Sequence, residues 1–219
     1  MDFEEYKYVG YKKKLNSVPL IIEESEIPQD YDGERYKSVY RFDDNILEYK
    51  SLAGLKKDIK FYADYLVLDI DDKSLQGAVT SLGKALEYLD FREVGYETWF
   101  SGSKGFHILI PTSQFNFQPT DDPDILKNMA IGLAEKCKVT IDTSIYNVSR
   151  ILRIKGSKHG KSGLYKVPLE QPRISLEEMK ELAKAPMEDP FPEPDDYPVN
   201  DTLVAVYSHL TDVTKVNRT

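Results

Sequence analysis

The stretch DYLVLDID at residues 64–71 constrains the fold most, because it joins an uninterrupted apolar run to two carboxylates. A continuous apolar middle is typical of a central strand that is covered on both faces. Side chains alternate along a strand, so Asp69 and Asp71 project from the same face near its end. Two carboxylates this close are costly unless a cation lies between them. Taken alone, the pair is more typical of a strand end whose acids belong only to a turn.

The segments around this strand alternate between β and α periodicity. Residues 73–89 carry apolar side chains at helical spacing, and residues 122–136 place Ile125, Met129 and Leu133 on one helical face. Short apolar or alternating runs predict strands, and they lie at 38–42, 96–100, 105–111, 139–142, 149–154 and 163–169. Strands mixed with helices in this order predict an α+β or mixed α/β fold.

Composition predicts where the main domain ends. Residues 186–198 hold five prolines among acidic residues, PMEDPFPEPDDYP, and such a composition is typical of a linker. We therefore expect one domain over residues 1–185 and a linker over 186–199. Residues 200–219 would then be a docked tail or the start of a neighbouring module.

Charge and cysteine content exclude several classes of protein. The formal net charge is -8 and the isoelectric point is near 5.0, which argues against a protein that coats duplex DNA but leaves room for a local basic groove. The single cysteine, Cys137, can form neither an intrachain disulfide nor a zinc knuckle. A reducing, cytoplasmic compartment is expected. Neither a signal sequence nor a membrane-spanning run is evident.

A turn rich in glycine and serine follows the central strand and its helix. It reads SGSKGFH and spans Ser101 to His107, with Ser103 and Lys104 inside it. Small residues let backbone N–H groups approach an anion closely, and Lys104 adds a cation. The turn is a candidate triphosphate cradle, although it lacks the spacing of a P-loop. A plain hairpin turn explains the same residues.

A third carboxylate, Asp142, precedes a window without any acid. No Asp or Glu lies between Asp142 and Glu170. Glycines and serines are interleaved with the cations of this window, which suits phosphates better than solubility. The cations are Arg150, Arg153, Lys155, Lys158, His159, Lys161 and Lys166. Three carboxylates and a basic hairpin together match nucleotidyl transfer by two metal ions, in which acids hold the ions and cations neutralise phosphates.

The four motifs also carry a resemblance. In chain order, LDID, SGSKGFH, ID and RILRIKGSKHGKSGL resemble motifs of the small catalytic subunit of archaeal and eukaryotic primases and of the wider primase-polymerase superfamily, including its viral and plasmid members. The likeness covers about residues 38–169. It implies the archaeo-eukaryotic primase catalytic core, in which an RRM-like sheet unit supplies the metal carboxylates.

The resemblance also implies a role for each matched residue. Asp69, Asp71 and Asp142 would be catalytic ligands of two Mg²⁺ or Mn²⁺ ions, and no zinc is expected. The residues that would contact the incoming NTP or dNTP are Arg41, Ser101, Ser103, Lys104, His107, Arg153, His159 and Lys161. Arg41 comes from Tyr40-Arg41-Phe42, a weak version of the family's R-E-F motif that lacks its glutamate. The family's zinc module and helical accessory domain are not evident, which leaves primer initiation open.

Three functions remain in competition at this stage. The first is DNA replication or primer synthesis, with single-stranded DNA template and primer as partners and a replicative helicase or other module beyond the linker. The second is a metal-dependent nuclease, since paired aspartates with a histidine also serve phosphodiester hydrolysis. The third is a non-catalytic module that binds single-stranded nucleic acid. The long basic hairpin disfavours the nuclease, which has no triphosphate to neutralise.

Overall fold

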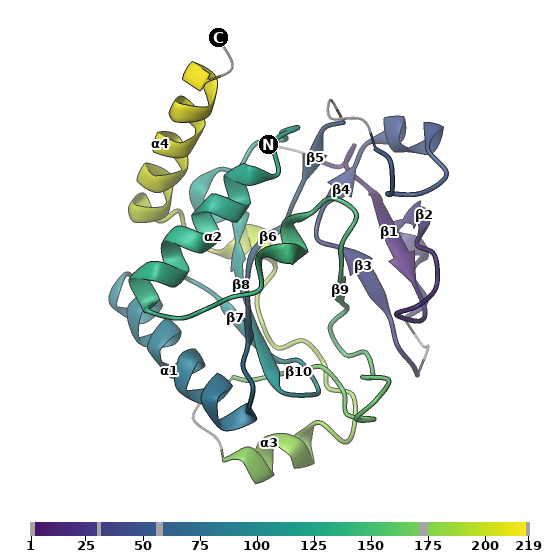
Figure 1. The fold of residues 1–219 in the computed structure, drawn as a ribbon, viewed down its shortest axis with the longest axis vertical. Coiled ribbons are helices and arrows are strands. Elements are labelled where there is room, and N and C mark those ends of the chain that lie inside the picture. The colour runs from purple at the N-terminus through teal and green to yellow at the C-terminus, as the bar shows by residue number, and fades with distance from the viewer. Residues whose placement is uncertain (1–2, 30–31, 56–58, 171–174, 218–219) are drawn as a thin grey trace.

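The chain folds into two antiparallel sheets with helices, as seen in a computed structural model that describes residues 3–29, 32–55, 59–170 and 175–217 (Figure 1). The predicted α+β class is confirmed. The strands are β1 (Tyr8–Lys12), β2 (Leu20–Glu23), β3 (Tyr36–Ser38), β4 (Arg41–Phe42), β5 (Phe61–Tyr62), β6 (Tyr65–Asp71), β7 (Glu97–Phe100), β8 (Gly105–Pro111), β9 (Ile151–Arg153) and β10 (Val167–Pro168). The helices are α1 (Leu75–Phe91), α2 (Asp124–Cys137), α3 (Leu176–Leu182) and α4 (Asp201–Asn217). Short 3-10 turns are η1 (Glu24–Glu26), η2 (Asp44–Glu48), η3 (Thr112–Phe115), η4 (Thr143–Tyr146) and η5 (Pro194–Asp196).

The second sheet, in the order β10-β7-β8-β6, is the centre of the fold. Strand β8 lies between β6 and β7 and is antiparallel to both, so β6 and β7 run parallel and α1 connects them. Helices α1 and α2 pack on one face of this sheet (Figure 1). Ser74 caps the start of α1, because its side chain accepts a hydrogen bond from the N–H of Gly77 at 3.0 Å. The apolar stripe of α1 is buried.

The first sheet has the order β5-β4-β1-β3-β9, and a further strand, β2, also pairs with β1. It lies across from the helix layer, with β6 and β8 between them (Figure 1). Its edge strand β9 comes from the basic hairpin, which is more than 100 residues after β3, its partner. This late pairing brings the basic hairpin to the face of the central sheet that the helices leave open.

Three predicted strands differ from the structure. Residues 38–42 are divided between β3 and β4, because the Ser38 side chain binds the Tyr40 carbonyl at 2.6 Å and turns the chain. Residues 139–142 form no strand and instead lead into η4. The segment 163–169 is extended in the sheet only at β10, because His159 and Leu164 close a turn before it. The predicted helices and the strands at β6, β7 and β8 are confirmed.

The Pro-rich segment and the tail lie against the core. The Phe191 ring is 5.8 Å from the Trp99 ring, and Asp189 pairs with Lys155 at 2.8 Å. In the tail, Leu203 is fully buried and the Tyr207 hydroxyl accepts a hydrogen bond from the Gln118 N–H at 3.1 Å. The predicted linker boundaries stay a prediction, but residues 186–199 contact the domain that precedes them. None of the helices in the described residues has the length and apolar character needed to cross a bilayer.

Candidate active site

The paired aspartates lie at the end of β6 on the face opposite the helices. The register of β6 and β8 sets Asp69 opposite His107 and Asp71 opposite Gly105. His107 Nε2 lies 3.6 Å from the Asp69 carboxylate. A Cβ atom at Gly105 would lie 2.1 Å from Asp71 Oδ1 and 2.7 Å from the Ile70 carbonyl, so only glycine fits this approach. The glycine of the predicted turn therefore makes room for the second carboxylate.

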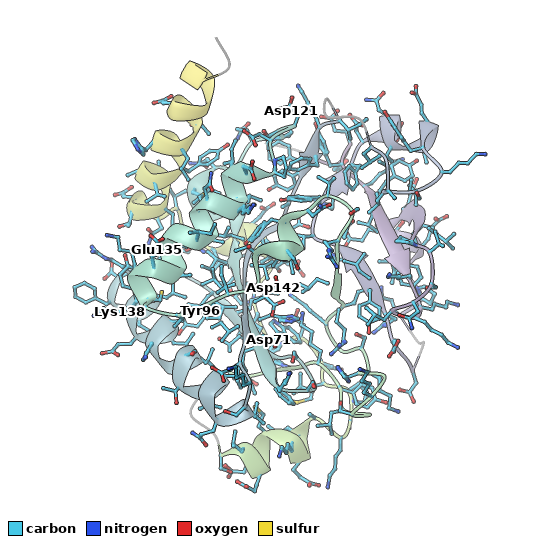
Figure 2. All side chains as sticks on the ribbon, in the orientation of Figure 1. Asp71, Tyr96, Asp121, Glu135, Lys138 and Asp142 are labelled. Carbon is cyan, nitrogen blue, oxygen red and sulfur yellow. The ribbon has the colours of Figure 1, made fainter. Side chains whose placement is uncertain are left out.

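The third aspartate reaches the same place through its backbone. The Asp142 N–H donates a hydrogen bond to the Asp69 carbonyl at 2.9 Å, which fixes the loop beside the end of β6. Its carboxylate accepts hydrogen bonds from the N–H and the hydroxyl of Ser144 at 2.8 and 3.0 Å. Asp71 and Asp142 line one cavity and appear near the centre of the view in Figure 2, between the helix layer and the first sheet.

Burial and the neighbouring acids perturb the pKa of Asp69. Burial, together with the charges of Asp71 and Asp142, raises the pKa of its carboxyl to about 7. Opposite it, burial holds the pKa of His107 well below its usual value, with Lys166 and Arg153 adding to the effect. The Nδ1 atom of His107 is buried and has no hydrogen-bond partner among the described residues. A strongly perturbed acid and a neutral histidine in one pocket are typical of functional sites.

The glycine-rich turn and the basic hairpin are joined to each other. Arg153 donates a hydrogen bond to the Ser101 carbonyl, and the Ser162 hydroxyl donates to the Gly102 carbonyl. Gly102 has a φ of 80°, and a Cβ there would lie 2.8 Å from the Leu164 carbonyl. The two predicted phosphate-binding segments are therefore a single structural unit.

His159 presents one ring nitrogen to the pocket. Its Nδ1 atom accepts hydrogen bonds from the N–H groups of Lys161 and Ser162 at 3.2 and 3.1 Å. Because Nδ1 is an acceptor, the proton of the neutral ring is on Nε2. Burial lowers the pKa of His159, and the nearby Arg153 charge lowers it further. The ring is thus arranged as a neutral hydrogen-bond donor.

One cavity of about 300 Å³ collects most of the predicted site. It is lined by Asp69, Asp71, Ser101, Ser103, Lys104, His107, Asp142, Arg153 and His159. Arg41 and Lys161 lie outside its lining. The Arg41 guanidinium pairs with Asp64 at 2.7 Å instead, and the Lys161 side chain is exposed on the hairpin turn. Their predicted contacts with a nucleotide stay predictions that this arrangement does not support.

Sequence reasoning missed four residues near the cavity. Tyr36, Ser144 and Arg150 line it, and the Arg153 guanidinium lies 5.6 Å from the centre of the Tyr36 ring. The Lys166 charge lowers the pKa values of both Asp69 and His107. Only Arg150 and Lys166 carried a signal in the sequence, since both belong to the acid-free window. Tyr36 arrives through the pairing of β3 with β9, which no local pattern predicts.

The donor set fits a hard divalent ion in kind. Carboxylate oxygens are the ligands that Mg²⁺ and Mn²⁺ prefer, and a cation would relieve the crowding that raises the Asp69 pKa. Among the described residues, however, no three His, Cys, Asp or Glu side chains lie close enough to hold one ion together. Mg²⁺ commonly takes one or two carboxylates and completes its shell with water and substrate phosphates. The pair Asp69 and Asp71 fits that mode best.

The comparison with solved structures finds a distant similarity in fold. No protein-family model and no curated protein sequence matches the chain. Among solved structures, the polymerase domain of ligase D from Mycobacterium tuberculosis, in complex with DNA, aligns over 94% of this chain and 82% of its own. The sequence identity is 13% and the TM-score is 0.46. A likeness this distant does not bear on the chemistry of the cavity.

Proposed function

We propose that this chain is a nucleotidyltransferase of the primase-polymerase type, which adds an NTP or dNTP to a 3′-hydroxyl on a single-stranded DNA template. One observation carries the proposal. A single cavity gathers nearly all the residues that the family motifs single out, from four separate segments of the chain. Asp69, Asp71 and Asp142 line that cavity together with Lys104, Arg153 and His159. Nucleotidyl transfer needs carboxylates that bind metal ions next to cations and hydrogen-bond donors that bind phosphates.

In the proposed reaction, the primer 3′-oxygen bonds to the α-phosphorus of the nucleotide while the bond from that phosphorus to the bridging oxygen breaks. The hydroxyl proton is lost and pyrophosphate leaves. Two divalent ions, when bound, would acidify the hydroxyl and neutralise charge on the leaving group. Asp69 and Asp71 would hold the ions, and Asp142 would add a ligand once its carboxylate gave up its hydrogen bonds from Ser144.

The cations and hydrogen-bond donors of the cavity would bind the triphosphate. Lys104 is exposed at the tip of its turn, so it can reach phosphate oxygens in the solvent-facing part of the cavity. Arg153 is held by Ser101, and His159 offers Nε2–H as a donor. Donors fixed before the substrate arrives need little reorganisation during the reaction, which is the main source of electrostatic catalysis.

The test is a gel assay with labelled single-stranded DNA, primed and unprimed, with NTPs or dNTPs and with Mg²⁺ or Mn²⁺. We expect extension of the primed template by the wild type. Asp69→Asn and Asp71→Asn should each lower the rate by about a thousandfold, since the loss of ion-mediated charge stabilisation is worth several kcal/mol. The unprimed template tests whether the chain also initiates.

Asp72→Asn is the matched control. Asp72 adjoins the pair, but its side chain only accepts a hydrogen bond from the Ser74 N–H at 3.2 Å, which asparagine can also do. This variant should extend the primer at the wild-type rate. Near-wild-type extension by Asp69→Asn and Asp71→Asn would sink the proposal. Degradation of the DNA without nucleotides would favour the nuclease, and binding without either reaction would favour the binding module.

A further inference from the structure

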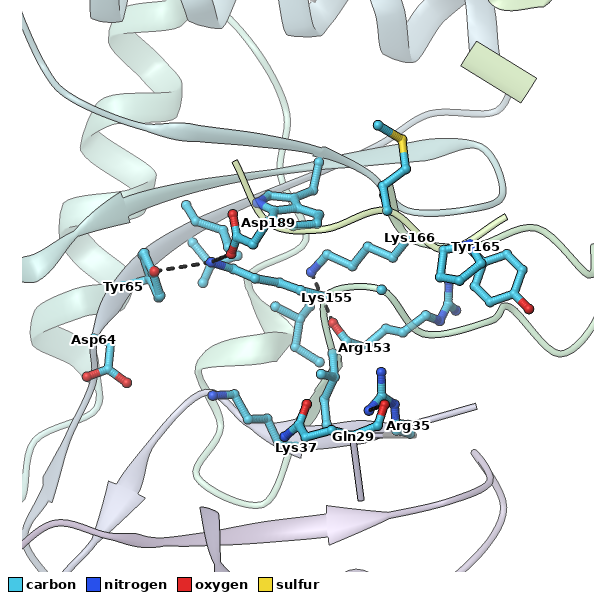
Figure 3. Close-up of a pocket in the computed structure, with 18 of the residues that line it drawn as sticks. Gln29, Arg35, Lys37, Asp64, Tyr65, Arg153, Lys155, Tyr165, Lys166 and Asp189 are labelled. Atoms are coloured by element: carbon cyan, nitrogen blue, oxygen red, sulfur yellow. Dashed lines mark hydrogen bonds and ion pairs between the residues drawn. The ribbon is translucent and has the colours of Figure 1, made fainter. Parts of the chain in front are cut away.

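A second, larger cavity lies between the two sheets, next to the candidate active site. It measures about 870 Å³ and shares Leu152 and Arg153 with the first cavity (Figure 3). Its walls come from the open face of β6, β7 and β8, from the first sheet and from residues 186–189. Cavities of this volume are ordinary sites for small molecules.

Several charges on its walls already have partners. Lys155 Nζ lies 2.6 Å from the Glu97 carboxylate. It also lies 2.8 Å from the Asp189 carboxylate (Figure 3). Asp64 pairs with Arg41, and Lys37 pairs with Glu24. Lys155 faces two carboxylates and the other two pairs are one to one, so these groups together carry one net negative charge. An anion that binds here must therefore be held by the other cations of the cavity.

Two buried cations have no carboxylate partner among the described residues. Lys166 is 1% exposed, and its Nζ atom donates to the Arg153 carbonyl at 3.0 Å. Arg35 is 5% exposed and donates to the carbonyls of Pro28 and Gln29, while its Nε atom has no partner among the described residues. Both side chains line the cavity (Figure 3). Burying a cation without an anion is costly, so an anion in the cavity would be stabilising.

The apolar part of the wall suggests what else the anion carries. Val39, Leu109, Ile154 and Met187 line the same cavity and offer no hydrogen bond. We propose that the cavity is a second binding site for a phosphomonoester, whose phosphate binds Lys166 and Arg35 and whose organic part packs on this apolar wall. A phosphate group has enough acceptor oxygens to satisfy an ammonium and a guanidinium together. This site would be separate from the one proposed for the triphosphate.

Two further features of the cavity bear on how such an anion would bind. Burial lowers the pKa of Lys166 well below its usual value, with Lys155 and Arg153 adding to the effect, so an anion bound beside it would favour proton uptake. Asp189 extends over the cavity from residues 186–189 and already supplies a carboxylate to it. This carboxylate would repel an incoming phosphate, so its removal should tighten binding.

The test is isothermal titration calorimetry of the full chain in EDTA, which removes the divalent ions that the triphosphate site is proposed to need. The probes are inorganic phosphate, glucose 6-phosphate, adenosine 5′-monophosphate and adenosine. We expect both phosphomonoesters to bind more tightly than inorganic phosphate, and adenosine not to bind. Selective binding of the adenylate would identify a nucleotide site. Failure of both phosphomonoesters to bind would overturn the proposal, whatever the extension assay shows.

Three variants locate the site. Lys166→Met keeps the volume of the side chain, so it should fold with an equal or higher melting temperature and weaken binding by about 10- to 100-fold. Asp189→Asn should tighten binding, and it keeps the proposal testable if Lys166→Met fails to fold. Lys104→Ala, which changes only the first cavity, should leave binding unchanged. Loss of binding in Lys104→Ala but not in Lys166→Met would contradict the assignment.

Discussion

The two faces of the central sheet differ in almost every respect, although the same strands build both. Leu68, Ile70 and Ile108 point to the helix layer and are fully buried. Their neighbours Asp69, Asp71 and His107 point the other way and line the candidate active site. The helix face is held by close packing, which is insensitive to pH. The open face is held by ion pairs and hydrogen bonds, and it keeps perturbed carboxylates that packing alone would not tolerate.

The largest effect that would test this difference is a cavity in the helix face. Ile108→Ala should lower the free energy of unfolding by about 2–5 kcal/mol, because close-packed atoms cannot fill the void. Leu109→Ala is the matched comparison on the opposite face. It should cost less, since Leu109 already borders the 870 Å³ cavity and no new dry void forms. Urea unfolding of the two variants measures both values, and equal losses would break the comparison.

A buried ion pair on the open face should matter nearly as much. Glu97 is 0% exposed and forms an ion pair with Lys155 at 2.6 Å. It also accepts hydrogen bonds from the Tyr65 hydroxyl at 2.6 Å and from Trp99 Nε1 at 2.8 Å. Glu97→Gln keeps the shape but removes the charge, so it should cost about 3 kcal/mol in unfolding free energy. Thermal melts at several pH values measure it. When Lys155→Met is present in the same chain, Glu97→Gln should cost less. If the cost is unchanged in that double variant, the ion pair is not its cause.

The smallest of the three expected effects is a gain in stability, not a loss. The pKa of Asp69 is raised to about 7 in the folded chain, above its ordinary value of 3.8. At a pH between these two values, the folded state therefore binds a proton that the unfolded state does not bind. The stability of the fold falls as the pH rises from about 4 to about 7. Asp69→Asn removes this loss, so it should stabilise the chain by on the order of 2 kcal/mol at pH 8.

Melting curves in EDTA at pH 4.5 and pH 8 check this sign. The gain from Asp69→Asn should be clear at pH 8 and small at pH 4.5, where the wild-type carboxyl is already protonated. Asp44→Asn, at an exposed acid far from the site, is the control and should show no such dependence. A variant that is less stable than the wild type at pH 8 would mean that the carboxylate is needed for folding.

Local sequence patterns predicted much of this sheet. The continuous apolar run of β6, the helical spacing of α1 and the glycine-serine turn before β8 depend on neighbours along the chain, so they could be recognised without a structure. The strand predicted at residues 139–142 was wrong because Asp142 bonds to Ser144 and to the end of β6 instead of joining a sheet. Alternation cannot distinguish a strand from an extended loop of the same composition.

The sequence by itself determined which side chains share a face, since that follows from the two-residue period of a strand, and it placed Asp69 and Asp71 together. The tertiary structure decided which distant segments meet. It brought Asp142, Arg153 and His159 to that face. It also paired Arg41 with Asp64 outside the candidate site and buried Lys166. Such encounters depend on how the two sheets pack and on the pairing of β3 with β9, more than 100 positions later, and no local period encodes contacts over such distances.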